Sequence, residues 1–173
     1  NSLQDFSIDT SSATYAAVVV DAFDNLAATL NEKFVNLEEV GEKYKVDLQT
    51  YNSVVNNGLA KIAAINKDIR ESMVSNQYTE QYGPNELLDE RNLLIDEIST
   101  YGEVGVKYNS DGTVDVTIGG HKAVDGEIAD SIVYRENSDG TVNLTWKSAG
   151  QSAVPGKGIL SATVDLLNGR GPK

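Results

Sequence analysis

The residue types that most often do chemistry are few in this sequence, and their spacing does not bring them together. His121 is the only histidine, it follows two glycines, and there is no cysteine. A catalytic triad or a zinc site needs several such side chains at defined spacings. We therefore predict that His121 is a surface loop residue. The absence of cysteine excludes disulfide bonds and thiolate metal sites.

Five carboxylates lie close together between residues 86 and 97. A pair of carboxylates can act as acid and base in glycoside hydrolysis. All five belong to one short predicted helix, however, and no aromatic-lined cleft is indicated, so we interpret them as a solvated helix face. These residues are Glu86, Asp89, Glu90, Asp96 and Glu97.

Two other patterns resemble ligand-binding loops only in part. The string Asn-Ser-Asp-Gly occurs twice, but neither copy is followed by the distant acidic residue of a calcium loop. The segment 150–158 has one residue too many before its Gly-Lys pair, and it carries Gly158 where a phosphate-binding loop needs Ser or Thr. The sequence thus predicts no catalytic residue, no metal ion and no cofactor, and we expect that the protein is not an enzyme.

The chain of 173 residues is acidic along its length, with a formal net charge of -12. Without a basic patch to release counterions, nucleic acid and anionic membrane surfaces are poor partners. No apolar run approaches the ~20 residues of a membrane span. Because the sequence starts with Asn1 and closes on Gly171-Pro172-Lys173, we expect both ends to be cut from a longer protein.

Residues 21–73 carry one helical pattern, in which apolar residues recur three or four positions apart without a proline. At about 1.5 Å per residue, such a helix is on the order of 70 Å long. A stripe of that length must pack against other long helices or neighbouring subunits. Recurring eleven-residue steps predict a nearly straight or slightly right-handed helix. The stripe comprises Leu26, Leu30, Phe34, Leu37, Val40, Tyr44, Leu48, Tyr51, Val55, Leu59, Ile62, Ile65, Ile69 and Met73.

A second helix is predicted over residues 85–100, with Asn85 as its N-cap. The short polar link before it implies an antiparallel pair packed on the end of the long helix. Arg91 falls in the apolar row of this helix, between Leu87 and Leu94. We predict that it pairs with a carboxylate or with helix-end carbonyls of a neighbouring helix, because an unpaired buried charge is costly. The alternative is an aliphatic stem that covers apolar surface while the charge reaches solvent.

Beyond residue 102 the apolar period changes from 3.6 to 2, which indicates strands. Two hairpins are predicted around the repeated turns, which contain Asn109 and Gly112 in one copy and Asn137 and Gly140 in the other. Between the hairpins, residues 119–126 are expected to hold a turn and one short strand. Residues 159–167 are expected to form a short helix. The predicted class is α+β: a long helical rod of residues 1–102, joined again by 155–173, and a small antiparallel β domain of residues 103–154.

The segment 83–99 resembles the signature stretch of the bacterial flagellar hook-associated protein 1 family. Its pattern is carried here by Pro84, Asn85, Leu87, Leu88, Asp89, Arg91, Leu94 and Asp96. Glu86, Glu90 and Asn92 replace the Asp, Gln and Asp of the family. Residues 62–69, 119–126 and 158–169 are similar to further stretches of the same family, so the resemblance spans nearly the whole chain.

The resemblance implies a structural protein with no catalytic residues. Members of the family form a ring between hook and filament in an extracellular tube. The implied partners are the hook protein, the second junction protein and further copies of the chain itself, while the fragment alone is expected to be a monomer. The alternative is an extracellular binding or adhesion module that uses the β domain, near Tyr108, Tyr134 or Trp146. A cell-wall hydrolase ranks third.

Overall fold

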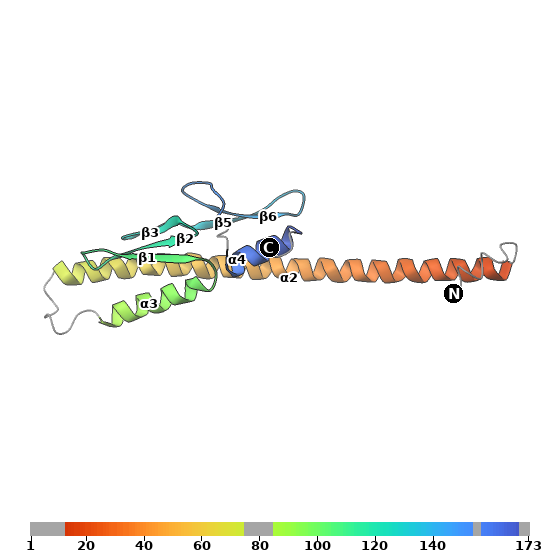
Figure 1. Ribbon diagram of the computed structural model, residues 1–173, viewed down its shortest axis with the longest axis horizontal. Helices are drawn as coiled ribbons and strands as arrows, with labels where there is room; N and C mark the ends of the chain where they lie inside the picture. Colours follow the sequence, from red (N-terminus) through yellow and green to blue (C-terminus); the bar gives the residue numbers. More distant parts are fainter. Residues whose placement is uncertain (1–12, 75–84, 154–156, 170–173) are drawn as a thin grey trace. The chain divides into compact units, whose positions relative to one another are not determined.

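The computed structural model describes residues 13–74, 85–153 and 157–169, and the side chains from residue 16 onward (Figure 1). The chain divides into two compact units, Asn1–Lys43 and Tyr44–Lys173, which are described separately. The class is α+β, as predicted. The elements in order are α2 (Ala13–Val74), α3 (Asn85–Ser99), β1 (Val104–Tyr108), β2 (Val114–Ile118), β3 (His121–Asp125), β4 (Ile128–Ala129), β5 (Ile132–Glu136), β6 (Val142–Trp146) and α4 (Ile159–Leu167).

Helix α2 has 62 residues and starts earlier than the pattern predicts. The β-branched residues 18–20 lie inside it, because their weak helix propensity costs only a few tenths of a kcal/mol each. The helix also continues through Gly41 and Gly58. A Cβ at Gly58 would lie 3.9 Å from Cγ1 of Ile98 in α3, an ordinary contact distance, so packing against α3 does not require glycine here.

In the first unit, α2 is the only described element. Every side chain of residues 16–43 is exposed, apart from two partly exposed positions, Val19 and Gly41. This part of the helix therefore gains almost nothing from tertiary burial inside the chain.

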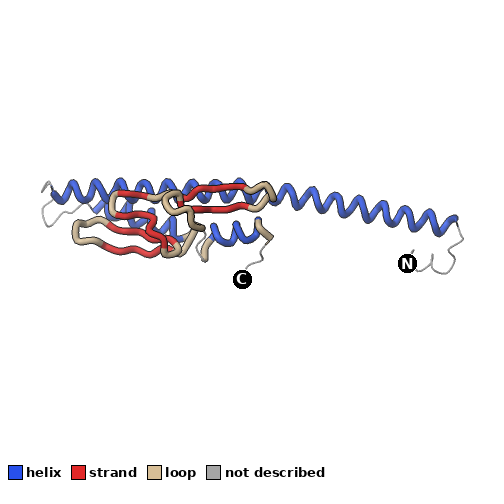
Figure 2. Tube along the Cα trace, turned by 90° about the horizontal axis from the view of Figure 1, so that it is seen from above, coloured by secondary structure: helices blue, strands red, loops and turns tan. Residues whose placement is uncertain are grey.

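In the second unit, α2 is covered by α3 and by the strands (Figures 1 and 2). Arg91 of α3 reaches Asn66 of α2, while Ile98 faces Gly58, so the two helices run antiparallel. The four-stranded sheet lies over the part of α2 near Asn66, and the β5–β6 hairpin over the part near Lys45 and Asn56.

A single hydrophobic core joins the helices and the strands of this unit. It includes Leu59 of α2, Ile98 of α3, Val116 of β2, Leu144 of β6 and Leu160 of α4. The strands therefore share the core of the helices in this unit. The predicted domain boundary at residues 102 and 103 stays a prediction.

The strands form a four-stranded antiparallel sheet in the order β1-β2-β3-β4 and a separate β5–β6 pair. Both expected hairpins are present, β1–β2 and β5–β6. Residues 119–126 hold a turn and one short strand, β3, as predicted. A further short strand, β4, follows at Ile128–Ala129 and pairs with β3. In β6, Val142, Leu144 and Trp146 alternate inward and are buried.

Three asparagine side chains connect helices to strands by hydrogen-bonding to both the N–H and the carbonyl of one strand residue. In each case the amide oxygen accepts from the backbone N–H and the amide nitrogen donates to the carbonyl of the same residue. The pairs are Asn56 with Ile132 at 2.7 and 2.8 Å, Asn66 with Val114 at 3.1 and 2.8 Å, and Asn168 with Val142 at 2.8 and 3.0 Å. Each asparagine thus supplies the hydrogen bonds that a neighbouring strand would give, which buried backbone groups require.

Replacing Asn56 should therefore destabilise the fold far more than replacing its neighbour Asn57. Asn56→Ala leaves the Ile132 N–H without its acceptor, although the Ile132 carbonyl keeps the bond from Asn52. We expect the free energy of unfolding to fall by about 1–3 kcal/mol. Asn57 is exposed, and Asn57→Ala should change the free energy of unfolding by about 0.5 kcal/mol or less. Equal effects of the two variants in urea denaturation would refute this role.

Candidate functional site

The apolar stripe of the first unit is the most conspicuous surface of the chain. It comprises Phe23, Leu26, Leu30, Phe34, Leu37 and Val40, with side chains between 49% and 69% exposed. At about 100° per residue these positions fall within a sector of about 120° on one side of α2. Acidic residues such as Asp24, Glu39 and Glu42 lie outside that sector. We call these six residues the exposed stripe.

The same stripe continues into the second unit, where most of it is buried. Leu48, Val55, Leu59, Ile62, Ile65 and Ile69 are in the core, and Tyr51 packs against it. Tyr44 and Met73, near the two ends of this part, are 37% and 53% exposed. A contiguous apolar face as long as the exposed stripe is unusual on a protein that works alone.

The signature motif forms the inner and outer faces of α3. Asn85 is its first residue, while Pro84 lies outside the described residues. Leu94 and Arg91 are buried, and Leu87 and Leu88 are partly buried. Asp89 and Asp96 are exposed, and so are the other acidic residues of this helix, Glu86, Glu90 and Glu97. The carboxylates therefore lie on a solvated helix face.

Arg91 is buried, but its partners differ from those that we predicted. Its Nη1 donates to the side-chain oxygen of Asn66 in α2 at 3.0 Å and to the carbonyl of Gly112 in the first hairpin turn at 2.8 Å. Among the described residues, neither a carboxylate nor a helix-end carbonyl accepts from Arg91, and the carbonyl of the turn is its backbone partner. Burial lowers the pKa of Arg91 from its usual value, which a weaker interaction with Tyr108 opposes.

The two repeated turns have the same internal geometry and different surroundings. In each, the Asn side chain donates to the Thr hydroxyl, and the Asp carboxylate accepts from that hydroxyl and from the Thr N–H. Gly112 and Gly140 both have a φ of 80°, a conformation that favours glycine. A Cβ at Gly112 would lie 2.6 Å from Sδ of Met73, whereas one at Gly140 would meet nothing within 4 Å.

His121 is not the isolated loop residue that the sequence predicts. It begins strand β3, its Nε2 lies 2.9 Å from Oδ2 of Asp130, and its ring stacks on Trp146 with centroids 4.3 Å apart. Asp130 also accepts from the hydroxyl and N–H of Ser148 and from the N–H of Ser131. Since Ser148 bonds to the carboxylate and not to the histidine, this is not the order of a catalytic triad.

Asp130 is the group that ties the two sheets together. Burial pushes the pKa of Asp130 up, but the hydrogen bonds from Ser148, His121 and two backbone N–H groups outweigh it. The pKa of this carboxyl therefore lies below its usual value.

The three aromatic residues considered for a binding surface on the β domain do not form one continuous exposed surface. Tyr108 is exposed on β1, Tyr134 is partly buried on β5, and Trp146 is buried on β6.

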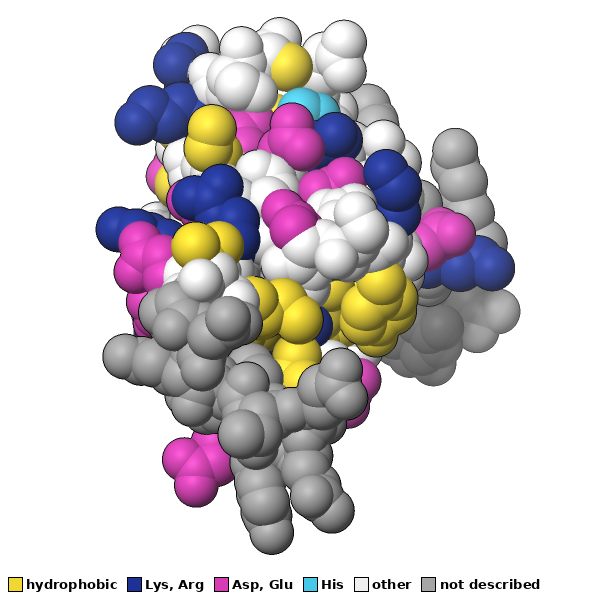
Figure 3. Space-filling model, turned by 90° about the vertical axis from the view of Figure 1, so that its left-hand side faces the viewer, with side chains coloured by type: hydrophobic (Ala, Val, Ile, Leu, Met, Phe, Trp, Pro, Cys, Tyr) yellow, Lys and Arg dark blue, Asp and Glu magenta, His cyan; other side chains and the backbone are white. Residues whose placement is uncertain are grey.

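The charged surface of the second unit mixes both signs. Figure 3 shows acidic and basic side chains interspersed on the end of the unit where α2 stops. Several form ion pairs, such as Arg70 with Glu127 at 2.6 Å and Lys122 with Asp125 at 2.9 Å.

Within the described residues no three acidic or histidine side chains are placed to hold a metal ion. None of the described helices is apolar enough over a sufficient length to cross a bilayer.

Comparison with known proteins explains the combination of a long helix, the α3 motif and a small β part. The family model described as "Flagellar hook-associated protein FlgK helical domain" matches residues 1–172. The chain belongs to this family. The resemblance inferred from the α3 motif is thereby confirmed.

Two similar proteins illustrate how much of a FlgK protein this chain represents. Flagellar hook-associated protein 1 of Bacillus subtilis (strain 168) is 33% identical over 114 residues, which cover 65% of this chain and 21% of the relative. The flagellar hook junction protein FlgK of Burkholderia pseudomallei has the same fold, with a TM-score of 0.76 at 19% identity. That match covers 95% of this chain and 30% of the other. The chain thus spans less than a third of the length of either protein.

Sequence reasoning found the stripe and missed the polar contacts of this FlgK helical-domain chain. The roles of Asn52, Asn56 and Asn66 went unnoticed, although asparagine is a poor residue for a helix interior. That mismatch was the available signal. No such mismatch in the sequence indicates the role of Asp130. Its side-chain partners His121 and Ser148 lie 9 and 18 residues away along the chain.

Arg91→Ala should lower the free energy of unfolding by about 3 kcal/mol or more. The change leaves the Gly112 carbonyl without its donor and opens a cavity between α2, α3 and the first turn. The matched control is Asn92→Ala at the exposed neighbouring position, with an expected change of about 0.5 kcal/mol or less. Chemical denaturation measures both, and an Arg91→Ala protein as stable as the control would contradict the assignment.

Asp130 should make the fold sensitive to acid. Because the pKa of Asp130 is lowered in the folded state, its contribution is fully present above the unfolded pKa of about 3.9 and is lost as pH falls through the folded value. Asp130→Asn should be less stable than the wild type at pH 7 and should lose less stability between about pH 4 and pH 2. Urea denaturation across this range measures the slopes, and parallel curves would exclude the effect.

Proposed function

We propose that this chain is a structural part of the bacterial flagellum, at the junction between hook and filament. In this role the exposed stripe of α2 packs laterally against long helices of neighbouring axial subunits. The single observation that carries the proposal is the exposure of all six stripe residues in a chain of the FlgK helical-domain family. The relatives named as hook-associated and hook junction proteins support the location.

Burial of the exposed stripe supplies the driving force for such packing. Removing a Leu or Phe side chain from water stabilises a contact by roughly 1.5–3 kcal/mol when burial is complete. Six such side chains therefore contribute enough to offset the loss of translational and rotational freedom, which costs about 4–15 kcal/mol. Gly41 lies on the same side of α2, and a Cβ there would meet nothing within 4 Å, so a neighbouring helix can approach closely at this position.

The proposed partners are the hook protein, the second junction protein and further copies of the whole protein, in an extracellular assembly. A mechanical role requires no reaction, so we propose that the chain is not an enzyme. By itself it is a monomer in this proposal, because the lateral contacts form between complete subunits that bring their other helices.

A charge on the exposed stripe should loosen the attachment of the filament. Leu37→Asp is introduced into the full-length protein in its flagellated host, and it places a carboxylate in the proposed contact, where burying it costs several kcal/mol. We expect filaments to be shed into the medium and swimming to be impaired. Val35→Asp is the matched control, since Val35 is 43% exposed and lies two residues away on the opposite side of the helix.

Circular dichroism of the purified proteins should show equal helix content for both variants, because neither position is buried within the chain. Wild-type filament retention by Leu37→Asp, or equal shedding by both variants, would count against the proposal.

A further inference from the structure

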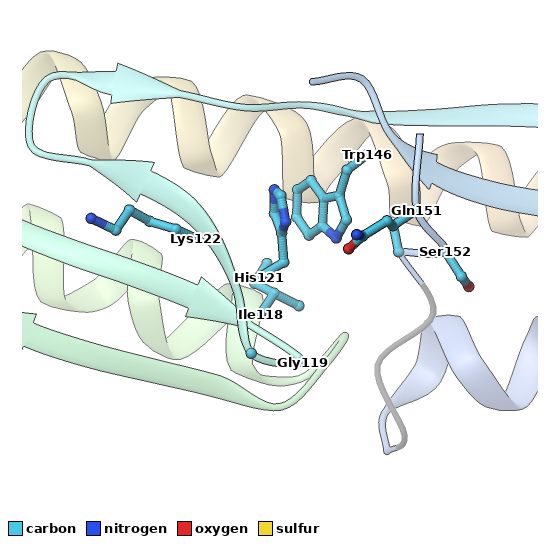
Figure 4. Close-up of a pocket in the computed structure, with 9 residues that line it drawn as sticks. Ile118, Gly119, His121, Lys122, Trp146, Gln151 and Ser152 are labelled. Carbon is cyan, nitrogen blue, oxygen red and sulfur yellow. The ribbon is translucent and has the colours of Figure 1, made fainter. Parts of the chain in front are cut away.

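β1 is an edge strand of the four-stranded sheet. It stands at one end of the order β1-β2-β3-β4, so β2 is its only strand partner among the described elements (Figures 1 and 4). The β1–β2 ladder continues at both ends in hydrogen bonds of 2.9 Å, from Asn109 N–H to the Thr113 carbonyl and from Gly119 N–H to the Glu103 carbonyl. Hydrogen-bonded pairs alternate along antiparallel strands. The odd-numbered residues of β1 therefore make the hydrogen bonds to β2.

The even-numbered residues of β1 turn their N–H and carbonyl groups to the open side. They are Val104, Val106 and Tyr108, and in the part of the chain that the structure describes these backbone groups have no hydrogen-bond partner. All residues of β1 are exposed or partly exposed. Proteins commonly protect such an edge with a proline or a bulge, but β1 contains no proline and pairs with β2 in continuous register. We call this side of the strand the β1 edge.

Elsewhere in the chain, backbone groups in the same position are covered. The N–H and carbonyl of Val114, Ile132 and Val142 are bound by the three asparagine side chains described above. Residues 151 and 153 also bind backbone groups of β6. The β1 edge has no such cover among the described residues. Its alternating donors and acceptors match the backbone of another extended chain, which is how a strand is added to a sheet.

A hollow of about 330 Å³ lies beside the β1 edge on the solvent face of the sheet. Glycine is required at its rim, because a Cβ at Gly105 would lie 2.6 Å from Oγ1 of Thr117. In sheets, an aromatic ring on the neighbouring strand can cover an edge glycine. The hollow is lined by Gly105, Val106 and Lys107 of β1, Asp115 and Thr117 of β2, and Lys122 of β3.

Lys107 supplies the charge next to this hollow. Its side chain is 76% exposed, and its ion pair with Asp115 is long, at 3.9 Å. Lys122 is held more closely, by Asp125 at 2.9 Å, and Figure 4 shows it extending along the sheet away from Trp146. Opposite charges directly across two strands attract each other. Lys107 is therefore the cation that favours a carboxylate on an added strand.

We propose that the β1 edge binds an extended segment of a partner protein as an added antiparallel strand. Val106 and its two even-numbered neighbours exchange backbone hydrogen bonds with alternate residues of that segment. The partner residue opposite Lys107 is acidic. The residue two positions later lies opposite Gly105, and it is aromatic and fills the hollow. The β1 edge shares no residue with the exposed stripe, so this proposal fails or holds independently of the helix packing.

The peptide acetyl-Thr-Glu-Val-Tyr-Thr-amide carries the proposed pattern, with its valine opposite Val106. It is titrated into the ¹⁵N-labelled chain, and the amide signals of Val104, Val106 and Tyr108 are followed by NMR. We expect saturating shifts of these three signals. No saturating shift, or saturating shifts only outside β1, would overturn the proposal. Shifts of the same signals that depend on protein concentration without peptide would assign the edge to a second copy and would also overturn it.

Two N-methylated forms of the peptide test the backbone hydrogen bonds. A methyl group on the valine nitrogen removes the N–H that donates to the Val106 carbonyl, and it should abolish the saturating shifts. A methyl group on the tyrosine nitrogen points away from β1 and should change the dissociation constant by about twofold or less. Equal weakening by both methyl groups would contradict strand pairing.

A charge exchange tests the side-chain contact. Lys107→Glu should weaken binding of the peptide by about fivefold. The same variant should bind acetyl-Thr-Lys-Val-Tyr-Thr-amide more tightly than the wild type does. Lys147→Glu is the matched control, since Lys147 is exposed outside β1, and it should keep the wild-type preference for the acidic peptide. An unchanged preference in Lys107→Glu would refute the assignment.

Discussion

The side-chain amide of Asn66 is the contact on which the second unit depends most. Its oxygen accepts from Arg91 of α3 and from the N–H of Val114, while its nitrogen donates to the carbonyls of Val114 and Gly126. One buried amide of α2 thus satisfies groups from α3, β2 and the turn after β3. Buried polar groups must be paired or they cost free energy. The oxygen and the nitrogen of this amide each make two hydrogen bonds, so the hydrophobic core can close around it.

A consequence is that one helix serves two purposes. From Leu48 to Ile69 the stripe of α2 holds α3 and the strands. In residues 16–43 the same pattern is not covered by any described element of the first unit. Since an isolated helix gains little stability from propensity alone, the N-terminal part needs a partner more than the C-terminal part does. This asymmetry agrees with a chain that spans less than a third of the length of the similar FlgK proteins.

Periodicity was sufficient to predict the long helix, the α3 helix, the two main hairpins and the α+β class. These features depend on residues close in sequence, such as the apolar row of α3 or the Asn-Ser-Asp-Gly turns. Periodicity was insufficient for the shared core, the short strand β4 and the His121–Asp130 contact. Each of these requires groups far apart in the chain. A polar side chain such as Asn56 has no periodic pattern that would distinguish a residue hydrogen-bonded to a strand backbone from a solvated one. Arg91 lies between the two cases: its burial was predictable, whereas its partners were not.

The repeated turns separate local from tertiary determinants of structure. The same six residues adopt the same hydrogen bonds whether the glycine packs against Met73, as Gly112 does, or faces solvent, as Gly140 does. The turn conformation is therefore encoded locally. Docking onto the helix is an additional property, supplied by Arg91 from outside the turn. A six-residue string of this kind keeps its internal hydrogen bonds in two different surroundings of one chain.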